Sequence, residues 1–176
     1  MSTNKCWYKE MAVYQIWPRS FCDGNGDGIG DIKGIMSKLD YIKSLGVDAI
    51  WFSPLYKSPQ EDMGYDIADY KDIAEEYGTL DEFKELLEAI HARGMKVIID
   101  GVFNHCGSFN KWLDKEHIYR DSTDEYAPGA FERYESPYHN FFKFYSNQWP
   151  DNNSYDGWWG HDTLPKLNYE GSKELE

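Results

Sequence analysis

The sequence predicts an α/β protein built on a parallel sheet, and two observations carry that prediction. Three short apolar runs rich in strand-forming residues stand at 13–16, 49–52 and 97–99. Between them, the segments 32–45 and 80–93 carry apolar residues at helical spacing. Because strands that alternate with helix-sized connections pair in parallel, the order β-α-β-α-β favours a single parallel sheet.

The three strand runs are nearly continuous in hydropathy rather than alternating, as in the Ala-Ile-Trp-Phe run at 49–52. Continuous apolar runs are typical of parallel strands that are covered on both faces. We therefore expect all three strands to be buried on both faces.

The two helical segments carry their own start and stop signals. In 32–45 the apolar side chains fall on one stripe, and Gly46 follows the last of them. The segment 80–93 begins with a T-x-x-E capping box formed by Thr79 and Glu82, and Gly94 ends it. We expect one helix over each segment.

Beyond His105 the periodicity disappears, and 106–169 is rich in Tyr, Trp, Asn, Asp, Ser and Pro. A structureless loop of that length is improbable in a compact domain. The segment is therefore interpreted as a small subdomain inserted after the third strand.

Composition excludes several classes of protein. The 176 residues include 31 acidic and 18 basic side chains, for a formal net charge of −13, which argues against a nucleic-acid or anionic-membrane partner. No apolar stretch approaches the roughly 20 residues that span a bilayer. The N-terminus shows no apolar signal region, and the three cysteines lack C-x-x-C spacing. We expect a soluble, cytoplasmic protein.

Asp, Asn and Gly alternate in the segment Asp23 to Asp31, Asp-Gly-Asn-Gly-Asp-Gly-Ile-Gly-Asp. Oxygen ligands at alternate positions between glycines suit a hard cation such as Ca²⁺. The loop agrees with an EF-hand at positions one, three, five and six, but Gly34 stands where the bidentate Glu is expected. A calcium loop in another setting and a metal-free surface turn are both open.

Two further polar clusters follow the second and third strands. Asp62 and Tyr65 could bind a sugar through a carboxylate and a stacked ring, but taken alone a solvated loop is the better explanation. Asn104 and His105 could serve a ligand, but a structural histidine is the simpler interpretation. In a βα barrel the loops after the strands build the active site, so three clusters in such positions favour a ligand site at one edge of the sheet.

Several motifs resemble glycoside hydrolase family 13, the α-amylase family. They are the D-x-x-x-N-H segment Asp100-Gly101-Val102-Phe103-Asn104-His105, the Leu164-Pro165-Lys166-Leu167-Asn168 segment, and the Gln15 to Phe21 segment before the Asp-rich loop. The opening is similar to α-glucosidases and oligo-1,6-glucosidases, and the Leu164 to Asn168 segment to neopullulanases and cyclomaltodextrinases. The α-1,4 or α-1,6 preference stays open between these branches.

The resemblance implies the N-terminal portion of a (β/α)₈ barrel with a B domain inserted after strand three. Residues 1–104 would be the barrel part, 105–169 the B domain, and 170–176 the start of the return to the barrel. It implies retaining cleavage of α-glucosidic bonds in oligosaccharides or α-glucans.

The resemblance also implies roles for single residues. Asp62, Tyr65 and His105 would bind the sugar ring under attack, while Asp100 and Asn104 would be structural. The Ca²⁺ ligands would be Asp23, Asn25, Asp27, the carbonyl of Ile29, and Asp31.

The family's nucleophile and acid/base follow later strands, and no residue of this chain matches them. We therefore expect 1–176 to be an inactive fragment of a longer enzyme. The alternative is a non-catalytic, calcium-dependent carbohydrate-binding or protein-binding module. Its carbohydrate-binding form would use exposed aromatic rings such as Trp149, Trp158 and Trp159.

Overall fold

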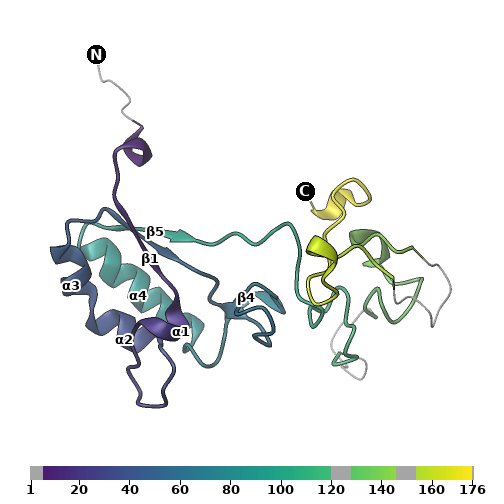
Figure 1. Cartoon of the computed structure of the whole chain (residues 1–176), viewed down its shortest axis with the longest axis horizontal. Helices are drawn as coiled ribbons and strands as arrows, with labels where there is room; N and C mark the ends of the chain where they lie inside the picture. Colours follow the sequence, from purple (N-terminus) through teal and green to yellow (C-terminus); the bar gives the residue numbers. More distant parts are fainter. Residues whose placement is uncertain (1–5, 120–127, 146–153, 176) are drawn as a thin grey trace. The chain divides into compact units, whose positions relative to one another are not determined.

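The computed structural model describes residues 6–119, 128–145 and 154–175 (Figure 1). It divides into two compact units. The first comprises Met1–Leu55 and Asp72–Gly101, and the second comprises Tyr56–Lys71 and Val102–Glu176. The segment Tyr56–Lys71 therefore groups with the residues after Val102, whereas the domain boundaries inferred from the sequence stay a prediction.

A three-stranded parallel sheet lies at the centre of the first unit. Its strands are β1 (Val13–Ile16), β2 (Ala49–Phe52) and β5 (Lys96–Ile99), in the order β1-β2-β5. In register, Ile16 pairs with Phe52, and Phe52 with Ile99. The expected α/β class, the three strands and their parallel pairing are confirmed.

The expectation that all three strands are buried on both faces is wrong for the two outer ones. Val13 of β1 is 40% exposed and Ile99 of β5 is 43% exposed, whereas Ala49, Ile50 and Phe52 of β2 are fully buried. The reason is position, because only β2 has a neighbouring strand on each side in this sheet.

Helix α4 (Leu80–Ala92) confirms the second predicted helix together with its capping box. The Thr79 hydroxyl accepts a hydrogen bond from the N–H of Glu82 at 3.2 Å, and the Glu82 carboxylate accepts one from the N–H of Thr79 at 2.8 Å. Both orphan donors at the helix start are thereby satisfied. The helix contacts α2 and β5 (Figure 1).

The single helix expected over 32–45 is two helices, α2 (Ile32–Ser37) and α3 (Leu39–Ser44). Lys38 separates them with φ −108° and ψ 4°. The Ser37 hydroxyl donates to the carbonyl of Gly34 at 2.7 Å, and such a bond competes with the helical ladder and bends it. The apolar stripe nevertheless stays continuous, since Ile35, Leu39 and Ile42 are all fully buried.

The remaining elements of the first unit are short and were not expected from the sequence. They are the 3₁₀ turn η1 (Trp7–Lys9) and helix α1 (Pro18–Phe21). Proline at the first position of α1 supplies a φ suited to a helix start.

The second unit has little regular structure. A two-stranded sheet joins β3 (Tyr56–Lys57) to β4 (Asp69–Ile73), whose last two residues belong to the first unit. Beyond His105, the helical elements of the described residues are the 3₁₀ turns η2 (His139–Phe141), η3 (Trp158–Gly160) and η4 (Lys173–Leu175). The buried core consists of Cys106, Leu113, Ala130, Phe141, Phe142, Tyr155 and Leu167, and further aromatic side chains pack against it. The expected loss of periodicity after His105 is thus confirmed where the structure describes the chain.

The longest described helix, α4, has 13 residues. In the described part of the chain no helix combines the length and apolarity required to cross a bilayer.

Candidate functional site

A buried carboxylate organises the loop that carries Asp62 and Tyr65. Asp66 is fully buried, and its carboxylate accepts three hydrogen bonds, from the Ser58 hydroxyl at 2.7 Å, the Glu61 N–H at 2.8 Å and the Asp62 N–H at 3.1 Å. The loop turns tightly, because Gln60 and Met63 both have positive φ, 65° and 53°. Asp66 therefore fixes the backbone from which the Asp62 side chain projects into solvent.

The segment after Val102 lies directly against this loop. Gly107 donates its N–H to the carbonyl of Ile67 at 2.8 Å, and a Cβ built on Gly107 would lie 2.5 Å from the carbonyl oxygen of Asp66. The hydroxyl of Tyr70 lies 2.8 Å from the carbonyls of both Val102 and His105. Close backbone approach and the hydroxyl of the half-buried Tyr70 thus hold the two segments together.

His105 sits at the junction of these segments and is 7% exposed. Its Nε2 lies 3.2 Å from the carbonyl of Tyr65, and its Nδ1 lies 3.2 Å from the amide nitrogen of Asn104. Since a carbonyl only accepts and an amide N–H only donates, this geometry requires a neutral ring protonated on Nε2. Burial lowers the pKa of His105, against smaller raising effects of the Tyr65 carbonyl and of the Asp62 and Asp66 carboxylates.

We expect His105 to titrate below the ordinary histidine value of 6.5. NMR of the ring carbons measures this pKa, with the His105→Gln variant assigning the signal and the urea-unfolded chain supplying the reference. Because the unfolded imidazole takes up a proton first, the free energy of unfolding should fall as pH drops through about 6.5. A folded-state pKa at or above the reference would contradict the neutral-ring geometry.

The structure brings three of the site residues predicted from the sequence into one unit. Tyr65 and His105 are in direct contact, and Asp62 belongs to the same turn as Tyr65, whose N–H donates to the Asp62 carbonyl at 3.0 Å. Asn104 braces the His105 ring. Asp100 lies in the first unit, where its N–H donates to the carbonyl of Phe52 at 3.2 Å.

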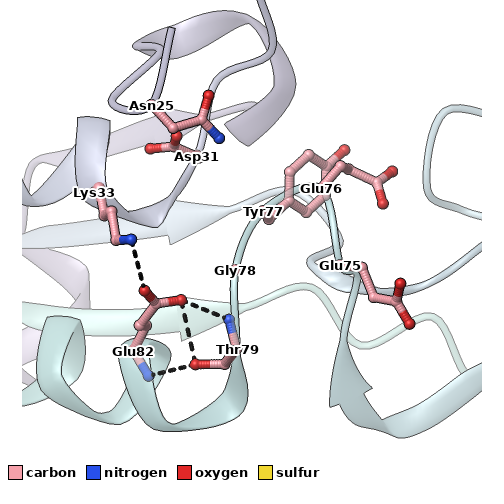
Figure 2. Close-up of a pocket in the computed structure, with 9 residues that line it drawn as sticks. All are labelled: Asn25, Asp31, Lys33, Glu75, Glu76, Tyr77, Gly78, Thr79 and Glu82. Atoms are coloured by element: carbon pink, nitrogen blue, oxygen red, sulfur yellow. Dashed lines mark hydrogen bonds and ion pairs between the residues drawn. The ribbon is translucent and has the colours of Figure 1, made fainter. Parts of the chain in front are cut away.

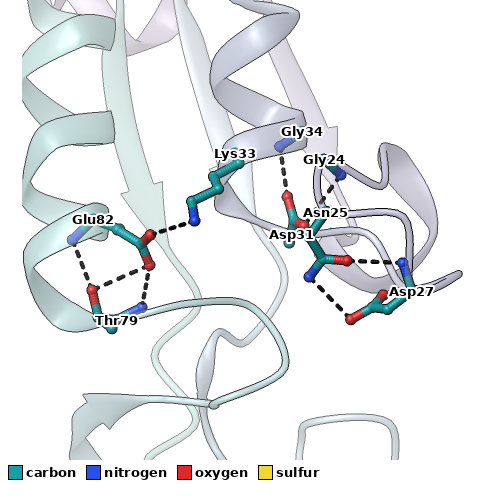
Figure 3. A network of polar contacts seen from close by, with 8 residues as sticks. All are labelled: Gly24, Asn25, Asp27, Asp31, Lys33, Gly34, Thr79 and Glu82. Atoms are coloured by element: carbon teal, nitrogen blue, oxygen red, sulfur yellow. Dashed lines mark hydrogen bonds and ion pairs between the residues drawn. The ribbon is translucent and has the colours of Figure 1, made fainter.

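The Asp-rich loop of the first unit is folded by its own side chains (Figure 3). Asp23 accepts hydrogen bonds from the N–H groups of Gly26 at 2.6 Å and Gly28 at 2.8 Å, and these bonds lower the pKa of its carboxyl. Asp31 accepts from the Gly24 N–H at 3.1 Å and also from the Gly34 N–H at 2.6 Å, which makes it the N-cap of α2.

The predicted calcium ligands of this loop are oxygen donors of the kind that Ca²⁺ prefers. A carboxylate oxygen that accepts one or two N–H groups retains a lone pair for a cation. However, the described residues hold no group of three or more His, Cys, Asp or Glu placed to hold a metal ion, so the three aspartates of the loop do not gather around a common centre.

A cavity of about 310 Å³ opens beside this loop in the first unit (Figure 2). It is lined by Asn25, Asp31, Lys33, Glu75, Glu76, Tyr77, Gly78, Thr79 and Glu82. Lys33 lies 3.2 Å from Glu82, and the Thr79 N–H, followed by Lys33, lowers the pKa of the Glu82 carboxyl. On this wall of the cavity Glu82 contacts both Thr79 and Lys33. These contacts connect α2 with the start of α4.

Sequence reasoning missed Asp66, Gly107 and Tyr70 as residues that hold the site together. Asp66 was visible only as part of an acidic loop, and its burial depends on the fold. Gly107 through its backbone and Tyr70 through its hydroxyl contact backbone groups 32 to 41 residues away, for which the sequence carries no local signal.

Comparisons with known proteins support the family resemblance found in the sequence. A family model for the alpha amylase catalytic domain matches residues 15–174. An oligo-1,6-glucosidase of Parageobacillus thermoglucosidasius is 54% identical over 122 residues, covering 66% of this chain and 22% of that protein. An alpha-glucosidase of Candida albicans is 52% identical over 122 residues, covering 69% and 21%.

Among solved structures, the trehalose-6-phosphate hydrolase of Bacillus licheniformis superposes with a TM-score of 0.79 at 39% identity, over 96% of this chain and 31% of that one. The chain spans about a fifth of the length of the curated relatives it matches. The matched range covers nearly the whole sequence and includes the motifs that carry the resemblance. The chain therefore belongs to the α-amylase family, glycoside hydrolase family 13.

Proposed function

We propose that this chain is the substrate-binding part of a retaining α-glycosidase that acts on α-glucosidic oligosaccharides. The observation that carries the proposal is the contact between His105 and the Tyr65 backbone, which joins the Asp62–Tyr65 turn to the D-x-x-x-N-H motif. In this proposal the chain supplies the first βα units of a (β/α)₈ barrel, and 105–169 is its inserted B domain.

Each of the three residues has a part in this proposal. The exposed Asp62 carboxylate accepts hydroxyl protons, and the half-buried Tyr65 ring offers a face to sugar C–H groups. Neutral His105 holds this turn in place, because its Nε2–H donates to the Tyr65 carbonyl. Retaining cleavage needs two carboxyl groups about 5–5.5 Å apart, and we assign neither of those roles to a residue of this chain.

Ligand-observed NMR of the 176-residue chain with methyl α-glucoside tests the proposal. We expect saturable binding that weakens about tenfold in Asp62→Ala, which removes one charge-assisted hydrogen bond. Asp81→Ala removes another exposed carboxylate, from α4, and should leave the affinity unchanged. Absence of binding by the unaltered chain, or equal losses in both variants, would contradict the proposed site.

We also propose that Ca²⁺ draws together oxygen donors of the Asp-rich loop that do not gather around a common centre in the structure. These donors are Asp23, Asn25, Asp27, the Ile29 carbonyl and Asp31. Support comes from the alternating oxygen donors and from the Asx turns that already fold the loop. Binding only the folded state would raise its stability by about 2.7 kcal/mol at a hundredfold excess of ion over Kd.

Calorimetry checks this as a rise in Tm on adding Ca²⁺, reversed by chelator. The rise should be lost in Asp27→Ala and kept in Asp81→Ala. Equal rises in both variants, or the same rise with Mg²⁺, would contradict binding at this loop.

A further inference from the structure

Glycine follows an aspartate or asparagine three times in the Asp-rich loop, at Asp23-Gly24, Asn25-Gly26 and Asp27-Gly28. Such steps are prone to imide formation, in which the glycine nitrogen attacks the carbonyl carbon of the preceding side chain. Glycine favours the attack because it has no Cβ to shield its nitrogen. Residues 23–28 are all exposed, and a Cβ built on Gly26 or Gly28 would meet nothing within 4 Å in the described part of the chain. Neither burial nor crowding therefore protects the second and third steps.

Each of the three glycine nitrogens instead donates its N–H to a carboxylate. Gly26 donates to Oδ1 of Asp23 at 2.6 Å, and Gly28 donates to Oδ2 of Asp23 at 2.8 Å. Gly24 donates to Oδ2 of Asp31 at 3.1 Å. Such a charge-assisted bond must break before the nitrogen can attack, and the adjacent negative charge disfavours loss of the proton that makes the nitrogen nucleophilic. The Asp23 carboxylate thus masks two of the three nitrogens.

Asn25 is the residue at which imide formation would change the chemistry of the loop, because Asn25-Gly26 is the only Asn-Gly step in the sequence. Its Nδ2 donates to Oδ2 of Asp27 at 3.0 Å, and its Oδ1 accepts the N–H of Asp27 at 2.8 Å (Figure 3). Loss of the side-chain amide would put an anionic oxygen in the place of Nδ2, facing the Asp27 carboxylate. One attractive contact of the loop would then become a repulsive one.

We propose that Asn25 is a deamidation site that the Asp23 carboxylate keeps closed. In the reaction the Gly26 nitrogen loses its proton and forms a bond to Cγ of Asn25, and the Nδ2 group takes up a proton and leaves as ammonia. Water then opens the five-membered imide at one of its two carbonyl carbons, which gives aspartate or isoaspartate. Water is the only co-reactant, and nothing is oxidised or reduced.

Incubation of the folded 176-residue chain at mildly alkaline pH, with a chelator present so that no cation competes for the carboxylates, tests this proposal. Peptide mapping by mass spectrometry follows the conversion of Asn25, and ion-exchange chromatography separates the modified chain by its extra negative charge. The chain unfolded in urea supplies the rate of the unmasked Asn-Gly step.

Three variants separate the mask from the general order of the loop. Asp23→Ala removes the acceptor of the Gly26 N–H. Asp27→Ala is the matched control within the loop, because it removes the carboxylate that holds Nδ2 of Asn25 and leaves the Gly26 N–H on Asp23. Asp81→Ala removes an exposed carboxylate outside the loop.

We expect Asn25 of the folded, unaltered chain to deamidate about tenfold more slowly than in the unfolded chain, because a hydrogen bond to a charged acceptor must break first. Asp23→Ala should raise the folded-state rate about tenfold for the same reason. Asp27→Ala and Asp81→Ala should leave it unchanged. Equal rates in the folded and unfolded chains, or an unchanged rate in Asp23→Ala, would overturn the proposal. Equal acceleration in Asp23→Ala and Asp27→Ala would also reject the mask, and would assign the protection to the order of the loop.

Hydrogen exchange of the Gly26 amide in the unaltered chain keeps the test independent of how the variants fold. The bond to Asp23 predicts that this proton exchanges about tenfold more slowly than in the unfolded chain. Exchange at the unfolded rate would show that the nitrogen is not masked and would reject the role of Asp23.

Discussion

Replacing Asp66 by alanine is expected to lower the free energy of unfolding by about 3 kcal/mol and to abolish glucoside binding. The change removes the acceptor of three hydrogen bonds in a fully buried place, and buried donors left without a partner are costly. The turn carrying Asp62 and Tyr65 would then lose the anchor that sets its shape. Urea denaturation followed by tryptophan fluorescence measures the stability, and ligand-observed NMR the binding.

Two neighbouring variants separate stability from recognition. Asp62→Ala should weaken glucoside binding about tenfold while retaining stability, because its side chain is exposed. Asp66→Asn keeps one oxygen acceptor and should fall between the unaltered chain and Asp66→Ala in stability. An Asp66→Ala chain as stable as the original would show that the buried carboxylate does not hold the turn.

Replacing Gly107 by alanine should cost about 3 kcal/mol and weaken glucoside binding. The added Cβ would lie 2.5 Å from the oxygen and 2.6 Å from the carbon of the Asp66 carbonyl group, so the two segments must separate. Forcing extra atoms into a packed contact between backbones is destabilising to this extent. The same separation would stretch the contact between His105 and Tyr65.

The control is Gly94→Ala, which lies beyond α4 with φ +70° and has open space around its missing Cβ. It should cost only about 1 kcal/mol, from backbone strain alone, and leave sugar binding unchanged. Both variants are measured by the midpoint of urea unfolding. Equal losses of stability would mean that close approach at Gly107 is not what joins the segments.

Local signals predicted the elements that local interactions determine. The capping box of Thr79 and Glu82 marked the start of α4 correctly, and continuous apolar runs located β1, β2 and β5. The break at Lys38 was missed, because the apolar stripe keeps its helical spacing across the break. The stripe gives no sign of the hydrogen bond from the Ser37 hydroxyl to the Gly34 carbonyl that bends the helix. Strand β4 was missed because its sequence Asp-Tyr-Lys-Asp-Ile carries little apolar signal.

The sequence identified the residues of the candidate site but not how they are arranged in space. The motif containing His105 and the turn containing Tyr65 were both identified, yet their contact spans 40 positions. Whether two loops meet depends on groups such as Asp66 and Gly107, whose roles arise only on burial and close approach. The stacking of Trp158 on Trp159 likewise appears only in the structure, and Trp149, grouped with them in the sequence, lies outside the described residues.

Asp31 couples the Asp-rich loop to a helix through a single side chain. One oxygen accepts from the N–H of Gly24 in the loop and the other from the N–H of Gly34 in α2, so both amides depend on one carboxylate (Figure 3). Any event that draws the carboxylate toward the loop must change the exchange of both amide protons with solvent together. Helix α2 is thereby a built-in reporter, in which protection of the Gly34 proton reads out the state of a loop several residues upstream.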